Sequence, residues 1–282
     1  MSERDVIANT EHPATRASIT ADLRSLGIVS GDVVVVHTSM SAFGYVVGGS
    51  QAIVMALLDA VGPSGTLTMP GHSSDCSDPG QWQNPPVPEA WWPTMRAQMP
   101  AFDPYLTPTR QMGAVVETFH RIPGVVRSHH PMVSHLAFGP KASAIVDGHS
   151  LADGFGEQSP LARLHDFDAM VVLLGVGHAN NTSLHLAEHR SSWQGKQRSA
   201  QGAPLLVDGI RTWVTFDDLD GDTDDFEAVG AAFAAAGGVR SGLVGAATAS
   251  VMSQRAIVAF AAEWFSSHRP ASLATSSDEA SA

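Results

Sequence analysis

The sequence of 282 residues contains a single cysteine, Cys76. One cysteine cannot form an intramolecular disulfide or a multi-cysteine zinc or iron–sulfur site, and it favours a reducing compartment. No apolar run approaches the ~20 residues that span a bilayer, and the first residues lack the basic and apolar regions of a signal peptide. The sequence therefore predicts a cytoplasmic protein with no membrane partner.

Positive charge is also scarce, because 16 Lys and Arg residues face 28 Asp and Glu residues, for a net charge of −12. Binding to nucleic-acid phosphates needs Lys and Arg, so no nucleic-acid partner is expected. An acidic surface instead suits a cationic ligand. With 44% hydrophobic residues the chain is expected to be globular, as a monomer or a homodimer.

Segments typical of strands and helices alternate along the chain. Apolar runs bounded by turn residues predict buried strands at 33–37, 65–70 and 171–175. Helical spacing of apolar residues predicts helices that end near Leu26 and Gly62, and others over 111–121, 225–236 and 243–266. We expect 127–139 to be extended and a hairpin to turn at Asp208 and Gly209. This alternation predicts an α/β fold with a mixed, largely parallel central sheet flanked by helices.

The segment at about 71–110 differs in composition from the rest, since it is rich in proline and holds Trp82, Trp91 and Trp92. A loop of this length inside a compact domain is more often a lid or binding element than a plain connection. We therefore expect a single domain over 1–270 with a loop-rich insertion at about 71–110. The Ser/Ala-rich end, 271–282, is expected to be a disordered tail.

The segment 170–190 is the strongest candidate for chemistry. It reads as a strand, a glycine turn, a polar cap at Asn181, Thr182 and Ser183, and then a helix whose first turns carry His185. In open α/β sheets ligands bind beyond the carboxyl ends of the strands. The positive end of a helix dipole disfavours a protonated histidine, so His185 can remain neutral and act as a base.

The string HLAEH, which contains His185, Glu188 and His189, also matches the H-x-x-E-H pattern of inverted zinc peptidases. A zinc-dependent hydrolase is thus an alternative, with Glu263 as a candidate distant ligand. The string begins close to the helix cap, where the dipole opposes a bound cation. A helix-surface pair is therefore the favoured interpretation of Glu188 and His189.

Two further clusters suggest ligand contacts. The acidic segment 217–225 does not fit a calcium loop, because Gly221 is out of register, and it is either a solvated turn or a site for a cationic ligand. A binder of such ligands without catalytic activity is a third hypothesis. Hydroxyl groups after the first strand precede Gly48 and Gly49, which open a helix suited to a phosphate, and Arg127 and Ser128 offer a possible anion site.

Seven strings occur in order along the chain: VHTSMSAFG, GTLTMP, QNPPVPEAWW, MPAFDPYLTPTRQMG, RSHHP, SPLARL and LLGVGHANNTSLHLAEHR. Together they resemble the aminoglycoside N3-acetyltransferases of the antibiotic acetyltransferase family, over about residues 31–265. The resemblance implies an α/β fold distinct from GNAT acetyltransferases. It also implies transfer of an acetyl group from acetyl-CoA, without a metal, to the 3-amino group of an aminoglycoside antibiotic, which confers resistance. An acetyltransferase that acts on another amine is a further alternative.

The resemblance also implies roles for individual residues. His185 matches the histidine taken as the base, and we expect direct transfer in a ternary complex. The residues expected in catalysis are His185, Glu188 and Asp218. The residues expected to bind the coenzyme are His37, Thr38, Ser39, Ser41, Arg127, Ser128 and Thr182. The residues expected to bind the aminoglycoside are Asp75, Trp92, Glu157, Asp218 and Asp220.

One position departs from the family pattern. Many members have aspartate where this chain has Ala179. The missing carboxylate leaves another acidic residue to orient the imidazole of His185, for which Glu188, Asp218 and Asp220 are the candidates. The departure is expected to affect the substrate range.

Overall fold

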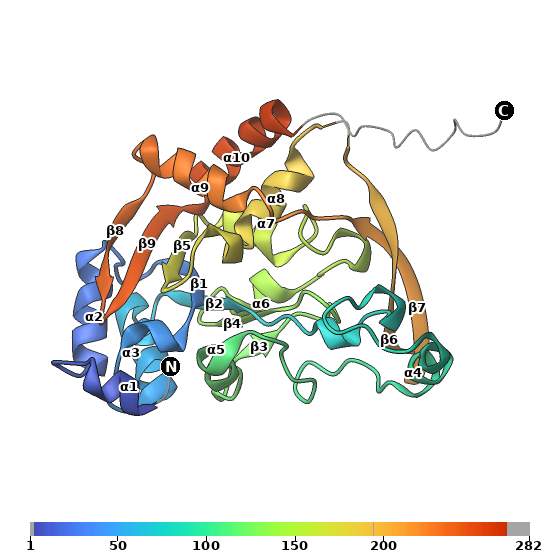
Figure 1. Ribbon diagram of the computed structural model, residues 1–282, viewed down its shortest axis with the longest axis horizontal. Helices are drawn as coiled ribbons and strands as arrows, with labels where there is room; N and C mark the ends of the chain where they lie inside the picture. Colours follow the sequence, from blue (N-terminus) through green and yellow to red (C-terminus); the bar gives the residue numbers. More distant parts are fainter. Residues whose placement is uncertain (1–2, 194, 270–282) are drawn as a thin grey trace.

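The computed structural model describes residues 3–193 and 195–269, so the tail expected over 271–282 lies outside the described residues. A seven-stranded sheet forms the centre of the molecule, in the order β3-β4-β2-β1-β5-β9-β8 (Figure 1). Its strands are β1 (Val33–Thr38), β2 (Thr66–Pro70), β3 (Val126–Arg127), β4 (His135–Phe138), β5 (Met170–Leu174), β8 (Arg240–Val244) and β9 (Ala247–Ser253).

Strand β1 lies in the middle and runs parallel to both β2 and β5. The strands outside this group pair antiparallel: β4 with β2 and β3, and β9 with β5 and β8. The predicted mixed sheet with parallel central strands is thus confirmed. Val33, Val34, Val35 and Val36 are all buried because helices cover both faces of the sheet.

Two groups of helices cover the two faces (Figure 1). Val34 and Val36 pack with α2 (Arg16–Ser25), α3 (Gly49–Val61) and α5 (Gly113–His120). Val33 and Val35 pack on the other side with α7 (Pro160–Asp166), α8 (Ser183–Arg190), α9 (Phe226–Ala235) and α10 (Gln254–His268). The shorter helices are α1 (Glu3–Ala8), α4 (Trp92–Gln98) and α6 (Ala142–Val146). Within the described ranges, no helix is long and apolar enough to cross a membrane.

The predicted helix over 243–266 is wrong in its first half. Strands β8 and β9 form a hairpin that turns at Gly245, and α10 begins at Gln254. The hydroxyl of Ser253 caps α10 by accepting a hydrogen bond from the Ala256 amide. Strand β9 is held by backbone pairing to β5, from Met170 to Leu174. The apolar run reads as a helix because small residues dominate it, and only the neighbouring strand decides its structure.

The predicted hairpin at Asp208 and Gly209 is confirmed. It joins β6 (Arg198–Val207) to β7 (Ile210–Leu219), and both turn residues have positive φ, of 50° and 77°. The hairpin stands away from the main sheet, beside α4 (Figure 1). The proline-rich segment 71–110 lies against it, since the Phe102 amide donates to the Pro204 carbonyl at 2.9 Å. The Gln81 side chain likewise donates to the Ala200 carbonyl at 2.7 Å.

Candidate active site

A cavity of about 230 Å³ lies where the central parallel strands end. Because β1, β2 and β5 run parallel, their carboxyl ends meet at one edge of the sheet. The residues that line the cavity come from these strand ends, from the segments that follow β2 and β5, from α5 and the residues just before it, and from the start of α8: Val36, His37, Thr38, Pro70, His72, Gln111, Met112, Val116, Val176, Ala179, Asn180, Thr182 and His185. The predicted position of His185 at the mouth of the sheet therefore coincides with a cavity.

The imidazole of His185 is held from several sides. Its Nδ1 atom lies 2.5 Å from Oε2 of Glu188, one turn further along α8. The ring of Phe155 stacks on it, with centroids 4.4 Å apart and planes at 10°, and Phe226 contacts it edge-on at 4.9 Å. Since Nδ1 is engaged by the carboxylate, Nε2 is the ring nitrogen left for a ligand.

Glu188 is completely buried, with 0% of its side chain exposed. Its second oxygen, Oε1, accepts hydrogen bonds from Nη1 of Arg269 at 2.6 Å and from the Asp222 amide at 2.9 Å. Burial raises the pKa of Glu188, but the bonds from His185 and Arg269 outweigh that effect and hold the pKa below its ordinary value. A charged Glu188 can therefore stabilise a protonated His185.

The interpretation of Glu188 and His189 as a helix-surface pair is wrong. Both side chains are largely buried, because α8 packs against α10, and each has its own partner. Nδ1 of His189 lies 3.1 Å from the carboxylate of Asp153, on the loop before α7. The imidazoles of His185 and His189 thus pair with different carboxylates and do not point to a common ligand position.

The zinc alternative can be compared with this geometry. Glu188 has one oxygen on His185 and the other on the cation Arg269, which opposes a second cation at the same place. Across residues 3–193 and 195–269, no three His, Cys, Asp or Glu side chains are grouped as metal ligands. The arrangement favours an imidazole–carboxylate pair over a metal site.

Three of the residues predicted to bind the coenzyme line the cavity with His185. Oγ1 of Thr182 lies 3.4 Å from Nε2 of His37. Burial lowers the pKa of His37 to about 3, so this ring stays neutral. The hydroxyl of Thr38 is buried and has no hydrogen-bond partner among the described residues. A buried hydroxyl without a partner is suited to bond a ligand.

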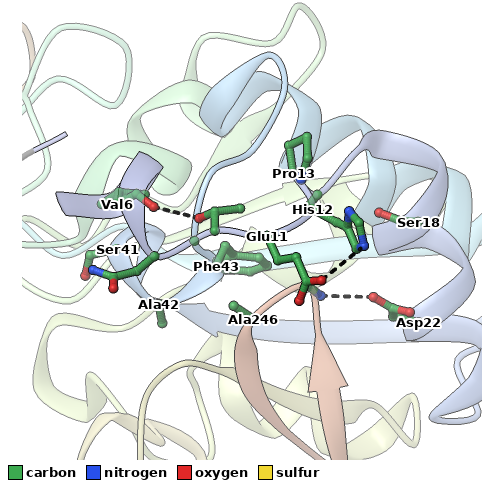
Figure 2. A pocket seen from close by; sticks show the side chains of 15 residues that line it. Val6, Glu11, His12, Pro13, Ser18, Asp22, Ser41, Ala42, Phe43 and Ala246 are labelled. Atoms are coloured by element: carbon green, nitrogen blue, oxygen red, sulfur yellow. Dashed lines mark hydrogen bonds and ion pairs between the residues drawn. The ribbon is translucent and has the colours of Figure 1, made fainter. Parts of the chain in front are cut away.

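Ser39 and Ser41 lie at the edge of this region. Their hydroxyl groups are 3.1 Å apart. Ser41 lines a different, open cavity of about 560 Å³ beside the N-terminal segment (Figure 2). In that cavity Glu11 and His12 point toward one another at 3.9 Å, and Asp22 accepts a hydrogen bond from the backbone. Among the residues that the structure describes, its lining contains acidic side chains and no Lys or Arg, which suits coenzyme phosphates poorly.

Arg127 and Ser128 are both buried and bonded to protein groups. Nε of Arg127 donates to Ser134 at 2.9 Å, and Nη2 donates to the carbonyl of Gly71 at 2.6 Å. Oγ of Ser128 lies 2.8 Å from Nδ1 of His149. Burial lowers the pKa of Arg127 to about 10, which leaves it charged. This geometry favours a structural role for Arg127, tying the insertion to β3 and β4.

None of the five residues predicted to bind substrate lines the His185 cavity in the described part of the chain. Asp75 lies 3.5 Å from Arg110 in a cavity of about 640 Å³ that shares Gln111 with the His185 cavity. Trp92 begins α4, with the guanidinium of Arg96 above its ring at 5.7 Å. Of Asp75 and Trp92, Asp75 is therefore the residue that lines a cavity adjoining the His185 cavity.

The other three residues predicted to bind the aminoglycoside, Glu157, Asp218 and Asp220, are bonded to protein groups. Glu157 pairs with Arg190 at 2.7 Å. Asp218 accepts a hydrogen bond from the Gly154 amide at 3.1 Å, and burial raises the pKa of its carboxyl group. Asp220 accepts a hydrogen bond from the hydroxyl of Ser199. Glu188, and neither Asp218 nor Asp220, is therefore the carboxylate bonded to the imidazole of His185.

Sequence reasoning missed several residues at the site. Phe155 stacks on His185. His72 lines the same cavity as His185, and its ring centroid lies 5.5 Å from that of Phe155. Burial keeps the pKa of His72 well below its ordinary value. Glu227 of α9 accepts a hydrogen bond from the Ala179 amide at 2.8 Å, beside the position of the missing aspartate. No local motif marks these residues, because they reach the site from distant segments.

The buried histidines predict a pH dependence of stability. Burial lowers the pKa of His37 to about 3 and of His130 and His135 to about 4, from an ordinary 6.5. Below pH 6.5 these histidines bind protons in the unfolded chain but stay neutral in the folded chain. The free energy of unfolding therefore falls as the pH decreases toward 4. Each ring contributes about 1.4 kcal/mol per pH unit in this range. Thermal denaturation should give a markedly lower Tm at pH 5 than at pH 7.5, and an equal Tm would contradict this.

Comparison with known proteins identifies the family. The family model described as aminoglycoside 3-N-acetyltransferase matches residues 35–266. The chain is 42% identical to the SPbeta prophage-derived aminoglycoside N(3')-acetyltransferase-like protein YokD of Bacillus subtilis, over 93% of this chain and 96% of YokD. The crystal structure of YokD superposes with a TM-score of 0.92. This chain is therefore a member of the aminoglycoside 3-N-acetyltransferase family.

Two solved structures of relatives contain ligands. AAC-IIIb in a binary complex with CoASH is 32% identical, with a TM-score of 0.81, and the match covers 90% of this chain and 97% of that chain. AAC-VIa bound to sisomicin is also 32% identical, with a TM-score of 0.82, over 90% of this chain and 98% of that chain. Both matches extend over nearly the whole fold.

Proposed function

We propose that this protein transfers the acetyl group of acetyl-CoA to an amine of an aminoglycoside, the 3-amino group of the 2-deoxystreptamine ring, and so confers resistance. The observation that carries the proposal is the bond between His185 and the buried Glu188, at a cavity formed by strand ends. Membership of the aminoglycoside 3-N-acetyltransferase family supports the substrate class. Relatives bound to CoASH and to sisomicin support the two ligands.

His185 acts as the general base in this proposal. An aminoglycoside amine is held as an ammonium ion and must lose a proton before it can attack. Nε2 of His185 takes that proton, and Glu188 stabilises the resulting imidazolium. The amine nitrogen then bonds to the thioester carbonyl carbon, and the carbon–sulfur bond breaks. The nitrogen passes its second proton to the departing sulfur, so the products are the amide and coenzyme A as its thiol, and His185 releases its proton to solvent. Transfer is direct, with both substrates bound in a ternary complex.

The coenzyme is proposed to approach from the side of His37, Thr38 and Thr182. These side chains are neutral polar groups at the cavity, and the hydroxyl of Thr38 has no partner in the described part of the chain. Backbone amides at the end of β1 or at the start of α8 can donate to the oxygen that gains negative charge during thioester attack. The net charge of −12 favours the approach of a polycationic sugar.

The test is acetyl-CoA turnover with a panel of aminoglycosides that differ in their amine positions, with each product mapped by NMR. The proposal expects acetylation at the 3-amino group of at least one 2-deoxystreptamine compound. Zinc-stimulated hydrolysis without acetyl transfer would refute it, as would acetylation confined to amines outside this class of antibiotic.

Restoring the missing carboxylate should improve aminoglycoside binding. Ala179 lines the cavity, and its amide is held by Glu227, so the Ala179→Asp substitution adds a carboxylate beside His185 on a fixed backbone. One added ion pair near the surface lowers the KM for aminoglycosides about twofold to fivefold and broadens the range of accepted compounds. Steady-state kinetics over the same panel checks this, with Ala179→Asn as the uncharged control. An unchanged profile would show that Ala179 does not limit the substrate range.

A further inference from the structure

Arg269 follows α10 and lies beyond the segment 35–266 that the family model matches. Only 9% of its side chain is exposed. Its guanidinium packs between the rings of Phe265 and Trp193, with Cζ 4.0 Å and 4.8 Å from the ring centroids. A guanidinium between two aromatic faces has a fixed orientation. The direction of its hydrogen bonds is therefore set by packing.

The hydrogen bonds of Arg269 reach two carboxylates. Nη1 donates to Oε1 of Glu188 at 2.6 Å. Nε and Nη2 donate to the two oxygens of Asp225 at 2.8 Å and 2.6 Å, and Nη2 also donates to the Asp222 carbonyl at 2.7 Å. Arg269 thus divides its charge between Asp225, which is partly exposed, and Glu188, which is fully buried and bonded to His185.

We propose that Arg269 is a positioning residue for the catalytic base: it fixes Glu188 and sets the pH at which His185 gives up its proton. The inference rests on the proposed function, in which His185 must be neutral to accept a proton from the amine. Arg269 touches neither the imidazole nor the cavity among the described contacts, so it acts through Glu188.

The direction of the effect follows from the charges. Nδ1 of His185 and Oε2 of Glu188 lie 2.5 Å apart and form one hydrogen-bonded unit. The positive charge of Arg269 beside Glu188 weakens the hold of this unit on its proton, and the negative charge of Asp225 partly offsets that effect. In the described part of the chain, the other charged or titratable groups around Glu188 and His185 are Lys196, His189, Asp222 and His72.

The substitution Arg269→Gln should move the acidic limb of the kcat/KM profile to higher pH. Without the guanidinium, the buried charge of Glu188 holds the proton of His185 more tightly, and the acidic limb moves up by about one pH unit. Arg269→Lys should show a smaller shift than Arg269→Gln, because lysine keeps the positive charge but lacks the paired N–H donors of the guanidinium. Arg255→Gln is the matched control, because the described contacts of Arg255 on α10 are with the carbonyls of His165 and Asp166 and with the carboxylate of Asp168, away from Glu188. Its profile should be unshifted.

The substitution Asp225→Asn should move the limb the opposite way. It removes the negative charge that competes for Arg269, so Glu188 feels more of the positive charge and the pair releases its proton at lower pH. We expect a downward shift smaller than one unit. General loosening of the site by either substitution cannot produce shifts of opposite sign.

A readout that needs no substrate separates this inference from the proposed function. NMR titration of the His185 imidazole, assigned by its loss in His185→Gln, should show the same opposite shifts of its midpoint. If the wild-type enzyme fails to acetylate aminoglycosides, the proposed function fails while the NMR midpoints still decide the role of Arg269. An unchanged midpoint in Arg269→Gln, or an equal loss of rate at every pH, overturns the inference. If Arg269→Gln does not fold, Asp225→Asn decides it, and an unshifted or upward-shifted limb overturns it.

Discussion

Replacing His185 by alanine lowers the turnover of aminoglycoside acetylation by about a hundredfold or more, because the amine loses the base that deprotonates it. Coenzyme binding should persist, since His37, Thr38 and Thr182 remain in the cavity. Steady-state kinetics gives the turnover, and calorimetry with acetyl-CoA gives the binding. Turnover near that of the wild type would remove His185 from the mechanism.

The matched control for this experiment is His189→Ala. His189 lies on the same helix but pairs with Asp153 and does not line the cavity. We expect turnover within about threefold of the wild type, because His189 contacts none of the groups proposed to react. A zinc site built on the HLAEH string would instead lose activity equally when either histidine is removed.

Replacing Glu188 by alanine should have the second large effect, on both stability and turnover. The substitution leaves the guanidinium of Arg269 buried with a lost partner and the Asp222 amide without its acceptor. Breaking one side of a buried ion pair decreases the free energy of unfolding by about 3 kcal/mol. Turnover should fall by about tenfold or more, because the imidazole loses the carboxylate that orients it.

Urea denaturation of Glu188→Ala measures the loss of stability. Glu263→Ala, an exposed position on α10, is the control and should change the free energy of unfolding by less than about 0.5 kcal/mol. Glu188→Gln keeps the volume and should lose less stability than alanine but a similar share of turnover. Equal stability of Glu188→Ala and Glu263→Ala would contradict the buried pair.

The three parallel strands β1, β2 and β5 could be predicted because they are locally distinctive. The run from Val33 to Val36 is apolar on both faces, which is typical of a strand covered by helices on each side. The cap and helix after β5 likewise placed His185 at a strand end before any contact was known. These strand and helix signals depend on residues that are close together in the sequence.

The rest depends on contacts between distant segments. The HLAEH spacing put Glu188 within reach of His185 but did not distinguish a metal ligand from a carboxylate bonded to the ring. That distinction depends on Arg269, which is 81 residues from Glu188 in the chain. Phe155 and strands β8 and β9 were missed for the same reason, since stacking and strand pairing come from partners elsewhere in the sequence.

The contact between Thr182 and His37 joins positions 145 residues apart in the chain. A gene recombined at any point in that interval would take His37 and Thr38 from one parent and Thr182 and His185 from the other. Exchange among related genes should therefore preserve this stretch as a single inherited block, together with the hairpin β6–β7, which bonds to segment 71–110 within it.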